Sequence, residues 1–228
     1  MKETIIALYD SLPTAEGVVQ DLLDNAYDPS HINLVINDAE RKYGQFLDRQ
    51  GVDQDVSSSE GAGFGSMIGG LTGLVAGLVA ITIPGIGPVL AAGPLAAVLG
   101  GLTGAAIGAG AGAITGGITA SLIDLGIPED ASAGYAEFLR RGGTMVAVTV
   151  EEKHVPFVTD ILKRHQPINL DERLNAWRQE GWQGYDPHAQ PLTVQDIERE
   201  RSLLRANVDT MAGQPIDHRI YRFPGEPR

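Results

Sequence analysis

Residues 61–123 read GAGFGSMIGGLTGLVAGLVAITIPGIGPVLAAGPLAAVLGGLTGAAIGAGAGAITGGITASLI, a stretch without a single charged side chain that is bounded by Glu60 and Asp124. Glycine recurs in it at every fourth position, in two series. These glycines are Gly61, Gly65, Gly69, Gly73 and Gly77, and then Gly100, Gly104, Gly108, Gly112 and Gly116. The segment between the series, Pro84–Pro94, predicts a turn. The pattern predicts a helical hairpin whose two arms each carry a glycine stripe.

Such a stripe is costly for an isolated helix. Each glycine disfavours a helix interior by about 1 kcal/mol relative to alanine, so ten glycines disfavour the hairpin by roughly 10 kcal/mol. Rows of small residues let a second backbone approach closely. Leucine and isoleucine occupy the other faces, and a helix that is apolar all round is buried in protein or in lipid. We therefore expect a glycine zipper that packs helix against helix.

Composition and charge exclude several classes of function. The chain has 228 residues and a formal net charge of −12, with a pI near 4.7. This acidic balance argues against nucleic acid and against an anionic lipid surface as partners. The absence of cysteine excludes disulfides and thiolate chemistry. The opening residues, MKETIIALYD, lack the apolar core of a signal peptide, so we expect a cytoplasmic protein.

The segments on either side of the charge-free stretch alternate between strand and helix patterns. We expect strands at 4–9, 32–36, 144–150 and 168–170, and helices at 12–27, 128–141 and 154–165. This order is close to a ferredoxin-like α+β sandwich with one additional helix before the third strand. The expected domains are a discontinuous α+β domain (1–60 and 124–174), the zipper hairpin (61–123) and a C-terminal tail (175–228). We expect the α+β domain to fold without the hairpin.

The tail has two tryptophans but is too short for a core of its own. Trp177, Trp182 and Tyr185 lie in an irregular, glycine-containing segment, and a helix is expected from Thr193 to about Ala206. We expect the three aromatic residues to dock the tail. Docking on its own domain and docking on a neighbouring subunit both remain open.

Several motifs together resemble one family. They are TIIALYDSLPTAEGVVQDLL (4–23), IPGIGPVLAAGPLAA (83–97), GIPEDASAGYAEFLRRGGTMVAV (126–148) and WRQEGWQGYDP (177–187). With the glycine arms, they make the chain similar to the general stress protein 17M-like (YflT-type) domain over roughly residues 1–174. Low-temperature-induced and general stress proteins look similar. The resemblance implies stress-linked expression and no established enzymatic activity, and it offers no catalytic motif to carry over.

The residues themselves offer little chemistry. The five histidines are scattered, without metal-ligand spacing. The glycine-rich stretch contains no Gly-Lys-Ser/Thr and no dinucleotide fingerprint, and there is no nucleophile elbow. Asp53, Asp55 and Glu60 are interpreted as a solvated loop. We therefore predict no catalytic, cofactor-binding or metal-binding residue and no cofactor.

Two functions remain. In the first, a non-enzymatic protein self-assembles into a homo-oligomer of many copies through the zipper. In the alternative, a membrane-inserted hairpin tethers the α+β domain to the cytoplasmic face of the inner membrane, because Phe64–Ile83 could span about 30 Å as a helix. The flanks of the stretch are acidic, its ends lack tryptophan and tyrosine, and its turn has no polar side chain. These features differ from those of membrane spans and favour assembly.

Overall fold

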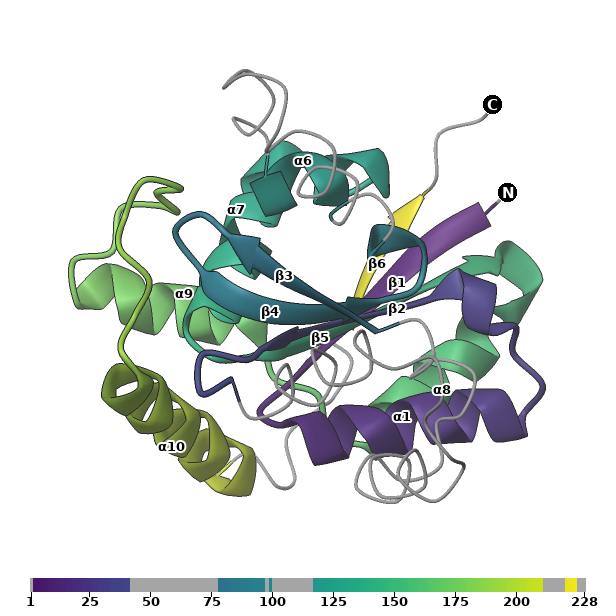
Figure 1. Cartoon of the computed structure of the whole chain (residues 1–228). Coiled ribbons are helices and arrows are strands. Elements are labelled where there is room, and N and C mark those ends of the chain that lie inside the picture. Colours follow the sequence, from purple (N-terminus) through teal and green to yellow (C-terminus); the bar gives the residue numbers. More distant parts are fainter. Residues whose placement is uncertain (1, 42–77, 97–98, 100–116, 211–219, 225–228) are drawn as a thin grey trace, which may run out of the picture.

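The computed structural model of the chain describes residues 2–41, 78–96, 99, 117–210 and 220–224 (Figure 1). The described elements, in order, are β1 (Lys2–Tyr9), α1 (Leu12–Asp24), β2 (Ile32–Asn37), β3 (Val79–Ile83), β4 (Gly87–Ala92), α6 (Gly117–Asp124), α7 (Glu129–Arg140), β5 (Thr144–Glu151), α8 (Val155–Arg164), α9 (Leu170–Gln179), α10 (Val194–Thr210) and β6 (Ile220–Pro224). Short 3-10 turns at Pro29–His31 and Glu152–His154 precede β2 and α8.

The six strands form one sheet in the order β3-β4-β2-β5-β1-β6, and every neighbouring pair is antiparallel. β1 lies between β5 and β6, so that Ile5 faces Val148 on one side and Arg222 on the other. β2 lies between β5 and β4. This mixture of helices with an antiparallel sheet confirms the predicted α+β class.

Helices cover both faces of the sheet, as Figure 1 shows with α1 and α8 below it and α6 and α7 above it. The alternation of side chains along a strand divides the core accordingly. Ile5 of β1 packs in the cluster that contains α1 and α8, whereas its neighbour Ile6 packs in the cluster that contains α6, α7 and α9. Because both faces are covered, the central strands read as continuous apolar runs.

The expected strand at 168–170 is wrong. Residues 169–172 read Asn-Leu-Asp-Glu, and the Asn169 side chain accepts a hydrogen bond from the backbone N–H of Glu172 at 3.3 Å. This N-cap starts helix α9 at Leu170. The Ile168 N–H still donates to the Leu8 carbonyl at 2.8 Å. The place beside β1 is taken by β6, from the end of the chain.

The predicted hairpin of helices is also wrong in its middle. Residues 79–83, expected to be helical, form β3; the turn is confined to residues 84–86; and residues 87–92 form β4. β4 pairs with β2, so the charge-free stretch contributes to the main sheet. Ile118 and Leu122 of α6 are also fully buried in the core. The described parts of the stretch, residues 78–96, 99 and 117–123, therefore pack in the α+β domain, and folding of the domain without the stretch stays a prediction.

The ten predicted zipper glycines, from Gly61 to Gly77 and from Gly100 to Gly116, lie outside the described residues. The glycine zipper stays a prediction. The tail, in contrast, is largely described. It supplies the second half of α9, the helix α10 at the expected place, and the edge strand β6.

Candidate functional site

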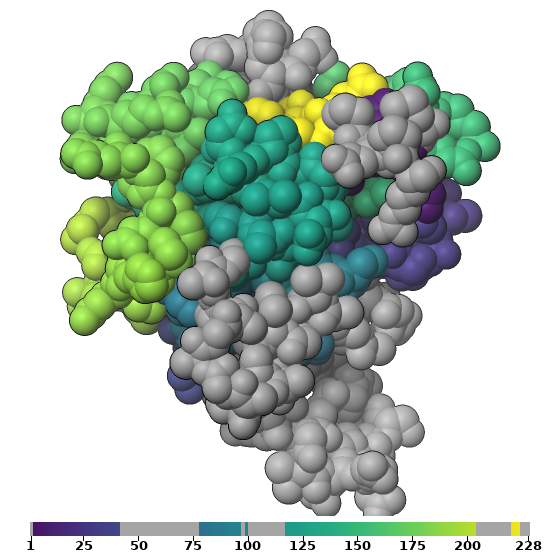
Figure 2. Space-filling model, turned by 90° about the horizontal axis from the view of Figure 1, so that it is seen from above, coloured from purple at the N-terminus to yellow at the C-terminus, as the bar shows by residue number. Residues whose placement is uncertain are grey.

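The three aromatic residues expected to dock the tail all pack against the domain of their own chain. Trp177 is 2% exposed and belongs to the core cluster beneath α7. Trp182 and Tyr185 are half-buried against the same cluster. Figure 2 shows this face of the molecule, with α6 and α7 in teal at its centre and the tail in green beside them.

The residues after α9 meet the turn between β3 and β4. We define residues 181–191 as the tail loop. The Tyr185 hydroxyl donates to the Pro84 carbonyl at 2.8 Å, and burial raises the pKa of this hydroxyl to about 12. Because the group stays protonated at neutral pH, it remains a hydrogen-bond donor to the turn.

Arg140, the last residue of α7, joins the turn to the tail loop. Its Nε donates to the Gly85 carbonyl at 3.1 Å, and its Nη2 donates to the Gln190 carbonyl at 3.2 Å. Gly85 has a φ of +77°, and a Cβ at this position would lie 2.8 Å from the Asp186 carbonyl oxygen. Glycine is therefore required both by the turn and by the close approach of the tail loop.

A buried carboxylate holds this arginine. Glu137 has a side chain that is 1% exposed, and its Oε1 accepts from Arg141 Nε at 2.7 Å and from Arg140 Nη1 at 3.2 Å. Arg141 also pairs with Glu200 of α10 at 2.9 Å, and its guanidinium lies 4.6 Å from the centre of the Trp177 ring. One charge network thus connects α7, α9 and α10.

This network was not predicted from the sequence. The only signal in the sequence is a glutamate followed by arginines three and four residues later, a spacing that places all three on one side of a helix. That spacing is common on solvated helices. It says nothing about burial, which here comes from the tail.

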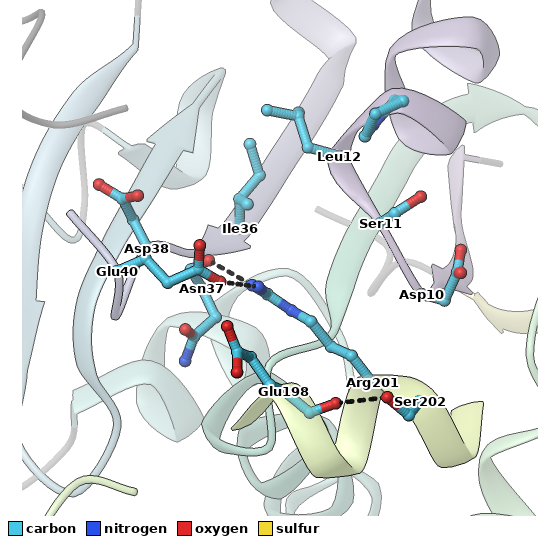
Figure 3. Close-up of a pocket in the computed structure, with 11 residues that line it drawn as sticks. Asp10, Ser11, Leu12, Ile36, Asn37, Asp38, Glu40, Glu198, Arg201 and Ser202 are labelled. Atoms are coloured by element: carbon cyan, nitrogen blue, oxygen red, sulfur yellow. Dashed lines mark hydrogen bonds and ion pairs between the residues drawn. The ribbon is translucent and has the colours of Figure 1, made fainter. Parts of the chain in front are cut away.

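A pocket of about 560 Å³ lies where β1 and β2 end (Figure 3). Both strands are antiparallel to β5, so they run in the same direction and their carboxyl ends meet at one edge of the sheet. The lining residues are Asp10, Ser11, Leu12, Pro13, Ile36, Asn37, Asp38, Glu40, Glu198, Arg201 and Ser202. Four of these side chains are carboxylates.

Arg201 of α10 crosses the pocket, as Figure 3 shows. It donates to Glu40 Oε1 at 2.6 Å, to the Asn37 carbonyl at 3.1 Å and to the Gly142 carbonyl at 2.9 Å. It is the only basic residue among those that line the pocket. The Arg201 guanidinium is therefore bonded to groups of the protein, and these contacts hold α10 against the domain.

The described residues of the pocket form no catalytic arrangement. Ser11 Oγ lies 2.9 Å from Thr14 Oγ1, and none of the described lining residues is a histidine or lysine that could activate a nucleophile. In the part of the chain that the structure describes, no three histidine, aspartate or glutamate side chains are grouped to hold a metal ion. His165 directly follows α8, and its Nε2 lies 2.8 Å from Oδ2 of Asp21 in α1. This contact joins the two helices.

The outer edge of β3 is the remaining candidate surface. Among the described strands, β3 pairs with β4 alone. Val79 is 41% exposed, and Ala80 and Thr82 are also exposed. The strand has no charged residue, and it begins two residues after Gly77, where the first glycine series ends.

No helix within the described ranges combines the length and the apolar character needed to cross a bilayer. No family model, no curated protein and no solved structure matches this chain. Its resemblance to the YflT-type stress proteins therefore stays an expectation.

Proposed function

We propose that this chain is a non-enzymatic, stress-related protein that assembles into a large homo-oligomer through residues 61–123. The observation that carries the proposal is the edge strand β3. The described strand of the charge-free stretch that follows the first glycine series lies at the margin of the sheet, with an exposed and uncharged edge.

An uncharged edge strand is unusual in a protein that stays monomeric. Natural sheets protect their edges with lysine, with proline or with bulges, because unpaired backbone groups invite a second chain. β3 has the sequence VAITI and none of these devices. The chain as a whole carries a charge of −12, so two copies repel each other least where neither is charged. This distribution favours association through the charge-free stretch.

The same strand weakens the membrane alternative. A bilayer core of about 30 Å needs about 20 helical residues, and 64–83 had that length. Residues 79–83 are now part of the sheet. Even a fully helical 64–78 would reach only about 22 Å, at about 1.5 Å per residue. The turn that would have to cross to the far side of the membrane is bound by Arg140 and Tyr185.

We further propose that the scaffold is a ferredoxin-like core made of β1, α1, β2, β5, α8 and β6. Two observations support it: the order β2-β5-β1-β6 within the sheet and the packing of α1 and α8 in one cluster on one face. On such a core, β3 and β4 extend the sheet beyond β2. Leu78, at the start of this extension, directly follows Gly77 in the chain, so the first glycine series is joined to the margin of the sheet.

The test is to lyse cells without detergent, separate membranes from the soluble fraction and size the soluble protein by light scattering and electron microscopy. We expect a large, homogeneous particle. Recovery only in carbonate-washed membranes would establish the hairpin anchor instead. A small soluble monomer would overturn both functions.

Zipper variants add a second arm to this test. Gly69→Leu and Gly108→Leu each improve intrinsic helix propensity by about 1 kcal/mol, yet we expect smaller particles because leucine excludes a neighbouring backbone. Leu74→Ala removes apolar area without blocking close approach and serves as the matched comparison. Particles of unchanged size in both glycine variants would contradict the zipper.

A further inference from the structure

The tail loop is a preformed unit. Asp186 organises it, because the His188 N–H donates to Asp186 Oδ1 at 2.8 Å and the Ala189 N–H donates to the Asp186 carbonyl at 3.2 Å. Pro187 and Pro191 restrict its backbone further. These hydrogen bonds and proline residues give the loop a defined local conformation.

The tail loop holds the β3–β4 turn at three points. Tyr185 binds the Pro84 carbonyl, and Arg140 bridges the Gly85 and Gln190 carbonyls. At the third point, a Cβ built on Gly87 would lie 3.2 Å from the Cβ of Pro191. The turn is therefore enclosed by the tail loop on one side and by the end of α7 on the other.

Apolar residues of the hairpin are buried near these contacts. Ile83 is 3% exposed and Ile86 is fully buried, in the same cluster as Trp182 and Tyr185. Loss of the tail loop would uncover this surface, in continuity with the exposed edge of β3. A large, uncharged apolar patch of this kind is seldom left exposed on a single chain.

We propose that the tail loop is a latch that clamps the β3–β4 hairpin and restrains self-association. This inference rests on the proposed function, and it names the element that regulates it. With the latch closed, the described part of the hairpin offers a second copy the edge of β3. With the latch open, the β3–β4 hairpin loosens, starting at its turn. Its apolar face can then pack against the apolar face of the same hairpin in a second copy.

The first experiment removes the polar contacts of the latch. Tyr185→Phe and Arg140→Gln, singly and together, are compared with the wild type by hydrogen exchange and by light scattering at equal concentration. We expect amide exchange at residues 79–92 to rise tenfold or more while β1 and β5 keep their protection, and we expect larger particles. Tyr27→Phe is a control for loss of a hydroxyl, since the Tyr27 hydroxyl is buried without a hydrogen-bond partner. Arg199→Gln is a control for loss of an exposed arginine.

The second experiment closes the latch covalently. The chain has no cysteine, and the Cβ separation at Gly87 and Pro191 is close to the range of about 3.5–4.5 Å found in disulfides. The double variant Gly87→Cys/Pro191→Cys is examined oxidised and reduced, so that any strain from the positive φ of Gly87 is common to both forms. We expect the oxidised form to give smaller particles and slower exchange at 79–92 than the reduced form.

The outcomes separate the two proposals. Unchanged exchange at 79–92 in the latch variants overturns the clamp. Faster exchange with particles that match those of the wild type overturns the restraint, while self-association stands. If neither the wild type nor any variant exceeds a monomer, the proposed function fails and the restraint fails with it.

Discussion

The two faces of the sheet are covered in different ways. α1 and α8 cover one face, and each lies in the chain directly between two elements of the core, with a regular apolar stripe that packs on the strands. The other face is covered by α6, α7, α9 and the tail, which come from distant parts of the chain. On that face, polar contacts as well as apolar packing fix the arrangement.

The two faces differ in how strongly they depend on specific polar contacts. A helix that follows its strand after a short connection is placed by the connection and by its apolar stripe. The tail has no such constraint. It is placed by directional groups, namely the Glu137 carboxylate with Arg140 and Arg141, and the Tyr185 hydroxyl on the turn. The second face should therefore be more sensitive to the loss of single polar groups.

The largest effect is expected from Trp177→Ala. Trp177 is almost fully buried and also donates to Glu200 at 3.3 Å, so the free energy of unfolding should fall by about 3–5 kcal/mol. Denaturant unfolding followed by circular dichroism measures it, with Trp182→Ala as a half-buried comparison that should cost less. A loss below about 1 kcal/mol would show that the tail is an accessory to the fold.

Ion pairs on the two faces of the sheet should contribute differently to the free energy of unfolding. Glu137→Gln leaves two arginines without their buried carboxylate and should lower the free energy of unfolding by about 3 kcal/mol. Asp21→Asn, which removes the partly exposed partner of His165 on the other face, should cost less than about 1 kcal/mol. Equal losses in the same denaturation assay would contradict the contrast between the faces.

A third, smaller effect on stability depends on pH and comes from Glu16 of α1. Burial raises the pKa of Glu16 from 4.5 to about 7. Because the folded state holds this proton more tightly than the unfolded state, the contribution of Glu16 is most favourable below about pH 4.5 and is lost as the pH rises through about 7. Glu16→Gln should remove this dependence and stabilise the protein at pH 8 by on the order of 1–2 kcal/mol. Melting temperatures of both proteins between pH 5 and pH 8 test it; parallel profiles would exclude it.

The smallest effect on stability is expected at the edge of the sheet. Val79→Lys places a charge on an exposed position, so the free energy of unfolding should change by no more than about 0.5 kcal/mol. Association should nevertheless decrease, because a lysine protects an edge strand. Sizing by light scattering measures the effect. Particles of wild-type size would exclude the β3 edge as a contact between copies.

The sequence was most informative where one physical pattern decided the structure. The apolar stripes of α1 and α8 and the apolar run at 144–150 predicted helices and a strand that the structure contains. β3 and β4 were missed because an uncharged run has no polar residues to reveal a period of two, and the glycine period dominated it. β6 is short and lies in a polar tail, so its pairing with β1 depends on a surface that forms only after folding.

The candidate site was predictable only in part. Trp177, Trp182 and Tyr185 stood out because large aromatic residues in a short tail need a surface to pack on. The positions of Arg140 and Arg201 could not be inferred, because each binds backbone carbonyls from segments fifty or more residues away. Such contacts follow from tertiary structure and leave no local pattern.

The pairing of β1 with β5 has a consequence for the chain as it is made. β1 pairs along its whole length with β5, from Lys2 with Glu151 to Tyr9 with Thr144. At a synthesis rate of about 5–20 residues per second, β1 waits roughly 7–28 s for this partner. The charge-free stretch leaves the ribosome during that interval, before the sheet that contains β3 and β4 exists. Slower translation should therefore lengthen the time for which these apolar residues are exposed.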